Sequence, residues 1–136
     1  MTIGMDRNNP WDLLPEHVPW LGLSSTQPDE GPLEFETLEL GIRAGIKLCY
    51  TFQSRGWNSP TLFVTRFAPP PENPTVEYIT NVCEWTGFRW DQILDFHNPT
   101  TLTRWAQAIF RQEQGTNGIT DTQILAAKAL ADGEQT

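Results

Sequence analysis

The spacing of apolar positions changes near residue 37, and from there to about residue 55 it is that of a helix. Two neighbouring apolar stripes run along this stretch, and they consist of Leu38, Ile42, Ile46 and Cys49, and of Leu40, Ala44, Leu48 and Phe52. A helix that is apolar on nearly all sides belongs in the interior of a fold. The pattern therefore predicts a central helix over about 37–55.

Two glycines lie four positions apart on one face of this predicted helix, at Gly41 and Gly45. Glycine inside a helix costs about 1 kcal/mol relative to alanine. That cost makes sense where a side chain would obstruct a close neighbour. We therefore expect another backbone segment or a ligand to approach the helix there.

Ser-Pro and Asn-Pro pairs punctuate the rest of the chain, and each places a capping side chain before a proline that fits the first helical turn. They predict helix starts at Ser59-Pro60, Asn73-Pro74 and Asn98-Pro99. These helices should end near residue 67, at Gly87 and at Gly115. Pro69–Pro71 predicts a stiff polyproline II arm, and one further turn or short helix is expected near 90–94. A last helix is predicted from Thr120 or Asp121 to about Ala131.

Several prolines before residue 33 prevent a long helix there. The length of 136 residues is that of one domain. We therefore predict a mainly α, compact, single-domain fold over residues 1–136. It should have a loop-rich N-terminal third over 1–32, a helical core over 33–115 and a C-terminal helix within 116–136.

The charge balance excludes some function classes. The net charge is −8, and nine Lys and Arg residues are scattered along the chain, whereas nucleic-acid binding needs a clustered basic face. No run of about 18 apolar residues predicts a membrane span. The first residues, MTIGMDRNNPW, lack the charged and apolar regions of a signal peptide. We therefore expect synthesis in a cytoplasm, no nucleic-acid partner and no membrane span.

The sequence also predicts no metal site and no cofactor. Cys49 and Cys83 lie in apolar helical patterns, as expected for reduced thiols in a core. Neither His17 nor His97 has the local spacing of a zinc ligand. No phosphate-binding loop, dinucleotide fingerprint or nucleophile elbow occurs.

Carboxylates near the predicted central helix are candidate catalytic groups. Glu36 and Glu39 lie at its start, and Glu72 follows the prolines. The simpler interpretation is that they stabilise helix N-termini electrostatically. The catalytic alternative needs one carboxyl in an apolar cleft with a raised pKa, able to protonate a glycosidic oxygen. Glu39, between Leu38 and Leu40, fits that alternative best.

Glu113 lies near the C-terminus of a predicted helix, where a negative charge is unfavourable. It therefore indicates either a partner such as Arg111 or a functional role. Among six tryptophans, most should pack in the core. Trp11 and Trp57 are expected to be partly exposed, where a flat aromatic face could bind a sugar.

An ordered series of motifs spans Asn8 to Gly115. It comprises Asn8-Asn9-Pro10, Glu39–Ala44 with Arg43, and Ala68–Tyr78, which contains Glu72, Asn73 and Thr75. The series resembles a family of small tailed-phage and prophage proteins described as virion structural proteins. The resemblance implies location in a virion and other virion proteins as partners.

That family is in turn distantly similar to lysozyme-like peptidoglycan hydrolases of the glucosaminidase kind. This similarity implies a lysozyme-like fold with a glycan strand between the N-terminal loops and the central helices. The acid would be Glu39, Glu36 or Glu72. Asn8, Asn9, Trp11, Arg43, Trp57, Asn73 and Tyr78 would bind the strand.

The activity implied is that of a peptidoglycan glycoside hydrolase or lytic transglycosylase. Two departures support an alternative, a non-catalytic virion structural or assembly protein. The chain lacks the Gly, Asn and Arg that follow the Asn-Asn-Pro turn in that family. It also has only Asp6, and no Glu, upstream of the turn. A third interpretation, a regulatory binder, rests only on small size and acidity.

Overall fold

The computed structural model describes residues 3–16, 18–116 and 118–133, and this part of the chain is mainly helical. The helices are α1 (Ile3–Asp6), α2 (Leu38–Ser54), α3 (Pro60–Phe67), α4 (Thr75–Thr86), α5 (Pro99–Gln114) and α6 (Asp121–Gly133). Among these residues, the one pairing of extended backbone is an antiparallel bridge between Leu23 and Phe35. The prediction of a mainly α fold with a loop-rich N-terminal third is confirmed.

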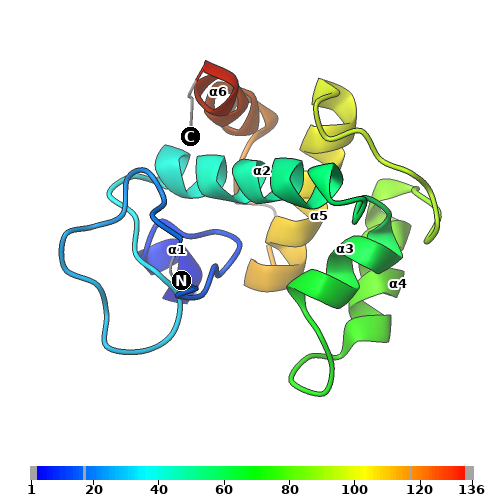
Figure 1. Cartoon of the computed structure of the whole chain (residues 1–136), viewed down its shortest axis with the longest axis horizontal. Helices are drawn as coiled ribbons and strands as arrows, with labels where there is room; N and C mark the ends of the chain where they lie inside the picture. Colours follow the sequence, from blue (N-terminus) through cyan, green and yellow to red (C-terminus); the bar gives the residue numbers. More distant parts are fainter. Residues whose placement is uncertain (1–2, 17, 117, 134–136) are drawn as a thin grey trace.

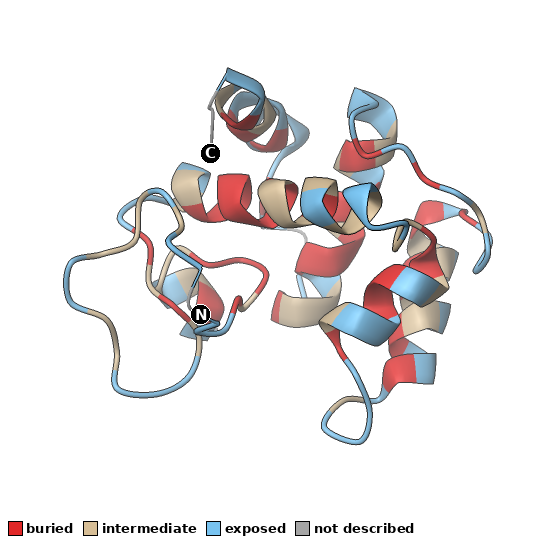
Figure 2. Cartoon of the chain, viewed as in Figure 1, coloured by how far each residue is buried: buried red, intermediate tan, exposed pale blue. Residues whose placement is uncertain are grey.

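Helix α2 is central, as predicted (Figure 1). It packs against α6, and α5 packs against α4, α6 and α2. Residues 41–46 of α2 are buried, with Ile42, Ala44 and Ile46 all at most 1% exposed, whereas much of the rest of the helix is half-buried or exposed (Figure 2). None of the helices within the described ranges has both the length and the apolar character needed to cross a membrane.

The two helical glycines of α2 receive the N-terminal segment of the same chain. A Cβ atom at Gly41 would overlap the carbonyl oxygen of Asn8, and one at Gly45 would lie 2.7 Å from the ring of Trp11. The predicted close approach is therefore confirmed: the backbone of Asn8 lies against Gly41, and the indole ring of Trp11 lies against Gly45. This contact fixes the N-terminal segment along α2.

Hydrogen bonds from polar side chains to backbone groups fix the conformation of the N-terminal segment. The side-chain amide of Asn9 donates to the carbonyls of Leu13 and Leu33 at 3.0 and 2.9 Å, and its oxygen accepts from the Leu13 amide at 2.9 Å. Arg7 donates to the carbonyl of Pro32 at 2.7 Å. A loop-rich segment thus acquires one conformation without a sheet or long helix.

Local capping rules hold for most helix ends. The side chain of Ser59 accepts from the Leu62 amide at 3.2 Å, and that of Asn98 accepts from the Thr100 and Thr101 amides at 3.0 and 3.1 Å. Helices α4 and α5 end before left-handed Gly87 and Gly115. These predicted boundaries are confirmed because each depends on neighbouring residues alone.

The proline-rich connection differs from its prediction. Residues 70–72 form a turn, not a polyproline II arm, and the Asn73 side chain donates to the Pro69 carbonyl at 3.1 Å across it. Asn73 therefore caps no helix, and α4 begins at Thr75 without a side-chain cap. The Thr75 hydroxyl instead donates to the Ala68 carbonyl at 2.6 Å, which ties α4 to the end of α3.

The stretch over 90–94 contains the turn that was one of its two expected forms, at residues 90–91, and no helix. It is held by backbone pairing, because the Leu94 amide donates to the Asn58 carbonyl at 2.7 Å and the Asn58 side chain donates back at 2.8 Å. This arrangement buries Leu94 and leaves Trp90 and Ile93 63% and 73% exposed.

Candidate functional site

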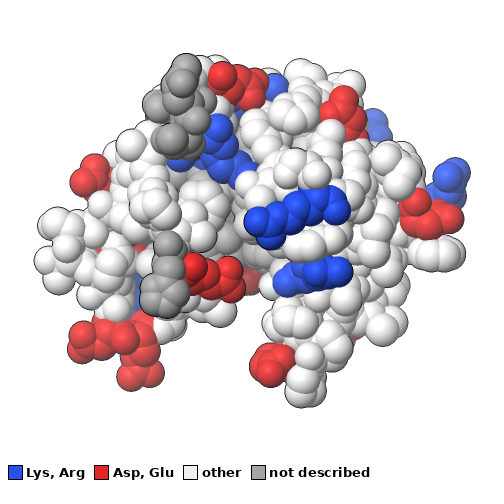
Figure 3. Space-filling view, viewed as in Figure 1, with Lys and Arg blue, Asp and Glu red and all other residues white. Residues whose placement is uncertain are grey.

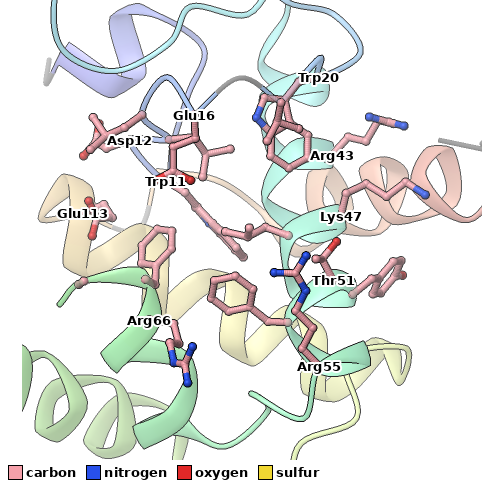
Figure 4. Close-up of a pocket in the computed structure, with 18 of the residues that line it drawn as sticks. Trp11, Asp12, Glu16, Trp20, Arg43, Lys47, Thr51, Arg55, Arg66 and Glu113 are labelled. Atoms are coloured by element: carbon pink, nitrogen blue, oxygen red, sulfur yellow. The ribbon is translucent and has the colours of Figure 1, made fainter.

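A groove of about 860 Å³ separates the N-terminal segment from α2 and α3 (Figure 4). One wall is formed by residues within 11–16 and 18–21, and the facing wall by α2 from Arg43 onwards together with its C-cap residue Arg55. The end of α3, with Arg66 and Phe67, and the last turn of α5, with Glu113, complete the lining. Residues from both ends of the chain therefore meet at one surface.

Glu113 forms the acidic end of the groove together with Asp12. The Tyr78 hydroxyl donates to Glu113 Oε2 at 2.9 Å, and the Glu113 carboxyl is hydrogen-bonded to that of Asp12. Burial is the main cause that raises the pKa of Glu113 to about 7. The hydrogen bond from Tyr78 lowers this pKa, whereas the negative charge of Asp12 and its hydrogen bond raise it. Burial also raises the pKa of Asp12, against the hydrogen bonds from Gln114 and Glu113. The two carboxyls therefore hold one proton near neutral pH.

The fold brings this pair together through the N-terminal turn. The Asp12 amide donates to the Asn9 carbonyl at 3.0 Å, and Asp12 adopts a left-handed φ of 53°. The Gln114 side chain donates to the Pro10 carbonyl at 2.9 Å. The end of α5 is thus fixed to the turn that presents Asp12. A protonated carboxyl held in this way is suited to donate a proton to a bound ligand.

The facing wall is cationic. Arg43, Lys47 and Arg55 recur on one stripe of α2 because residues four apart share a helix face. Arg66 of α3 joins them, and its guanidinium carbon lies 4.1 Å from the Trp57 ring centroid. Figure 3 shows Lys and Arg side chains beside a hollow on the molecular surface, with acidic side chains across it.

Aromatic rings cover the floor and rim of the groove. Trp11 contacts Phe67 edge to face, with ring centroids 6.3 Å apart. It is only 1% exposed, so the expectation that it would be partly exposed was wrong, because its ring packs against Gly45. Its buried Nε1 has no hydrogen-bond partner among the described residues. Trp20 and Tyr50 also line the groove.

Several predicted binding residues lie at this groove. Trp11, Arg43 and Asn73 line it, and Tyr78 contacts Glu113 from beneath. Trp57 lies beside it and is half-buried as expected, with the guanidinium carbons of Arg55 and Arg66 5.3 and 4.1 Å from its ring centroid.

Other predicted residues lie elsewhere. Glu36 and Glu39 are exposed near the start of α2, and Glu72 is exposed in the turn before α4. None of the three belongs to the lining of the groove. Asn9 is buried, with its side chain bonded to backbone groups, and the Asn8 side chain donates to the Phe35 carbonyl at 3.1 Å. These two asparagines hold the N-terminal segment in place.

Some of the groove residues that were not predicted as site residues could have been found from the sequence. Glu113 was conspicuous as a negative charge at a helix C-terminus, and Lys47 and Arg55 stand at four-residue multiples from Arg43. Asp12 had no such signal, because its role depends on a partner about one hundred positions away.

No group of three or more His, Cys, Asp or Glu side chains within the described ranges could hold a metal ion. His17 lies outside those ranges. Cys49 is buried and Cys83 half-buried, and both are free thiols. The acidic pair and the cationic wall are therefore the chemical groups that this groove offers.

Comparison with known proteins places the chain among phage proteins. No protein-family model matches it. It is similar to protein P5 of Pseudoalteromonas phage PM2, with 31% identity over 125 residues. The alignment spans 89% of this chain and 76% of P5. The resemblance to phage proteins is thus confirmed at the level of a phage-encoded relative. The chain belongs to the family of protein P5 of this phage.

Proposed function

We propose that this is a virion-associated, lysozyme-like phage protein that binds peptidoglycan glycan strands and cleaves their glycosidic bonds during infection. The observation that carries the proposal is Glu113, a largely buried carboxyl at the groove whose pKa is about 7. Glycosidases use a carboxyl of this kind as general acid, because it is still protonated at the pH of the reaction.

In the proposed reaction, Glu113 donates its proton to the glycosidic oxygen as the bond from that oxygen to the anomeric carbon breaks. The sugar then develops oxocarbenium character. The Glu113 carboxylate next accepts a proton from the attacking group. That group is water in a hydrolase or a hydroxyl of the same sugar in a lytic transglycosylase.

Asp12 acts on Glu113 and not on the sugar. It is hydrogen-bonded to Glu113, whereas the second carboxyl of a glycosidase pair lies about 5 Å or more away across the bond. Its charge keeps the proton on Glu113. Tyr78, bonded to the other side of the carboxyl, fixes its orientation.

The aromatic lining supports a sugar as the ligand. Trp20 is half-exposed at the rim and Trp11 lies at the floor, and a pyranose ring has an apolar face that stacks on flat aromatic surfaces. Arg43 and Asn73, predicted as binding residues, are proposed to contact the strand at the same groove.

The test is clearing of purified peptidoglycan, by turbidity and in a zymogram, for wild type, Glu113→Gln and Glu39→Gln. Loss of a general acid lowers the rate by about 10²–10⁴-fold. We expect that loss for Glu113→Gln and an unchanged rate for Glu39→Gln. Equal clearing by wild type and Glu113→Gln would contradict the assignment. Loss only in Glu39→Gln would instead favour the carboxylate that the sequence suggested.

A second candidate function is a non-catalytic role in virion assembly. It is favoured by Trp90 and Ile93, which are 63% and 73% exposed on the connection between α4 and α5. Large apolar side chains left in solvent together are typical of a contact surface. Particles carrying Glu113→Gln that infect normally, together with particles lost on Trp90→Ser, would support this role over the enzymatic one.

A further inference from the structure

Although this protein is acidic overall, several of its positively charged side chains gather at one groove. The chain has nine Lys and Arg residues and a net charge of −8. Four of the nine, Arg43, Lys47, Arg55 and Arg66, nevertheless line one groove. An acidic protein that gathers cations at one concave surface has a local potential opposite to its net charge.

These cations line one wall of the groove. Positions 43, 47, 51 and 55 follow each other at four-residue intervals along α2 and its C-cap residue Arg55, and Arg43 is only 1% exposed. At 1.5 Å per residue, the accessible stretch from Lys47 to Arg55 is about 12 Å long. In Figure 4, Lys47 and Arg55 lie on one side of Trp11, and Asp12 and Glu113 lie on the other. The wall therefore runs along the groove and does not neutralise the acidic pair.

The exposed members of the wall are available to a ligand. The ion pairs in the described part of the chain, Arg89–Asp91 and Lys128–Asp132, involve none of Lys47, Arg55 and Arg66. The guanidinium carbons of Arg55 and Arg66 lie over the Trp57 ring, 5.3 and 4.1 Å from its centroid. Stacking of this kind fixes a guanidinium while its N–H donors remain free for a carboxylate.

We propose that this wall binds the carboxylates of the peptides attached to the glycan strand, so that the groove selects peptide-bearing strands over bare ones. The inference rests on the proposed function, which puts the strand in the groove. A neutral polysaccharide could stack on the aromatic residues and accept a proton from Glu113, but it would form no ion pairs with the cationic wall. A strand that carries carboxylates at intervals could make all three kinds of contact.

Binding of soluble glycan strands to the Glu113→Gln protein tests the inference, because turnover is then slow. One sample keeps its peptides, and a matched sample has lost them to an amidase, after which the lactyl carboxylates that this hydrolysis frees on the strand are capped as neutral amides. We expect at least tenfold tighter binding of the peptide-bearing strands by calorimetry at low salt. The difference should shrink between 50 and 200 mM salt, since the contacts are exposed charge pairs.

Arg66→Gln and the double variant Lys47→Gln/Arg55→Gln should each reduce that preference at least threefold, with the affinity for bare strands unchanged. The control is Arg89→Gln, which removes an exposed arginine away from the groove and should keep the full preference. Circular dichroism melts verify that every variant folds.

Equal affinity for the two samples, or a preference untouched by the wall variants, would overturn the inference and leave the proposed function standing. Failure of the protein to bind either sample would overturn both. Tight binding of bare strands with no salt dependence would likewise overturn the inference and leave the proposed function standing.

Discussion

Replacing Glu113 by glutamine should stabilise the protein at neutral and alkaline pH. The pKa of this carboxyl is raised from 4.5 to about 7 in the folded chain, chiefly by burial. Between these values the folded state binds more protons at the site than the unfolded state does. The free energy of unfolding therefore falls as the pH rises through this window. Below about pH 4.5 both states are protonated and the site has no effect.

The magnitude follows from the pKa difference of about 2.5. At 1.36 kcal/mol for each pH unit, ionisation of Glu113 costs the fold about 3 kcal/mol above pH 7. Glutamine avoids this cost because it is neutral at every pH. Its amide can donate to Asp12 while its carbonyl accepts from Tyr78, as the protonated carboxyl does. In a chain of this size, 3 kcal/mol corresponds to about 10 °C in Tm.

The assay is a series of thermal melts of wild type and Glu113→Gln from pH 4 to pH 9. The Tm difference should grow from near zero at pH 4 to about 10 °C at pH 8. Glu39→Gln is the matched control, because that carboxylate is exposed in the first turn of α2. Its Tm difference should stay within a few degrees and show no trend above pH 5. Parallel curves for wild type and Glu113→Gln would refute the reasoning.

Three further changes test how the groove walls are held. Gly45→Ala puts a Cβ atom 2.7 Å from a tryptophan ring and should lower the free energy of unfolding in urea by about 1–3 kcal/mol. Gly133→Ala, with nothing within 4 Å, should leave it unchanged; similar values for the two would contradict the packing argument. Asn98→Ala removes the cap of α5 and should cost about 1 kcal/mol in the same titration, whereas Asn98→Asp should not. Tyr50→Phe removes a 2.6 Å hydrogen bond to α6 and should speed amide exchange in that helix by about tenfold or less, consistent with about 1 kcal/mol. Unchanged exchange would mean that this bond does not anchor α6.

Sequence predicted the helices well where their ends depend on neighbours. Ser59 and Asn98 cap helices as expected because the cap bonds to amides two or three positions ahead. Asn73 carries the same signal before a proline, yet its side chain closes a turn onto Pro69. The difference arises from the preceding prolines, which leave a carbonyl within reach of the amide.

The site was harder to predict because, on a helix, apolar neighbours in the sequence do not show that a side chain is buried. Glu39 is flanked by Leu38 and Leu40 in the sequence, but consecutive helical residues point in different directions. Its side chain is therefore exposed. Glu113 owes its raised pKa chiefly to burial and to a smaller extent to Asp12, and both result from the tertiary fold. Only its unfavourable place at the end of α5 was visible in advance.

The hydrogen bond from Gln114 to the Pro10 carbonyl joins residues 104 positions apart. On a ribosome adding about 5–20 residues per second, these two halves of the groove emerge about 5–20 s apart. Helices α2 to α4 are complete within that interval, whereas the acidic pair cannot form until α5 has left the tunnel. The acid is therefore assembled later than the helices that form the rest of the groove. Any activity of the groove begins only after the end of α5 has packed against the N-terminal turn.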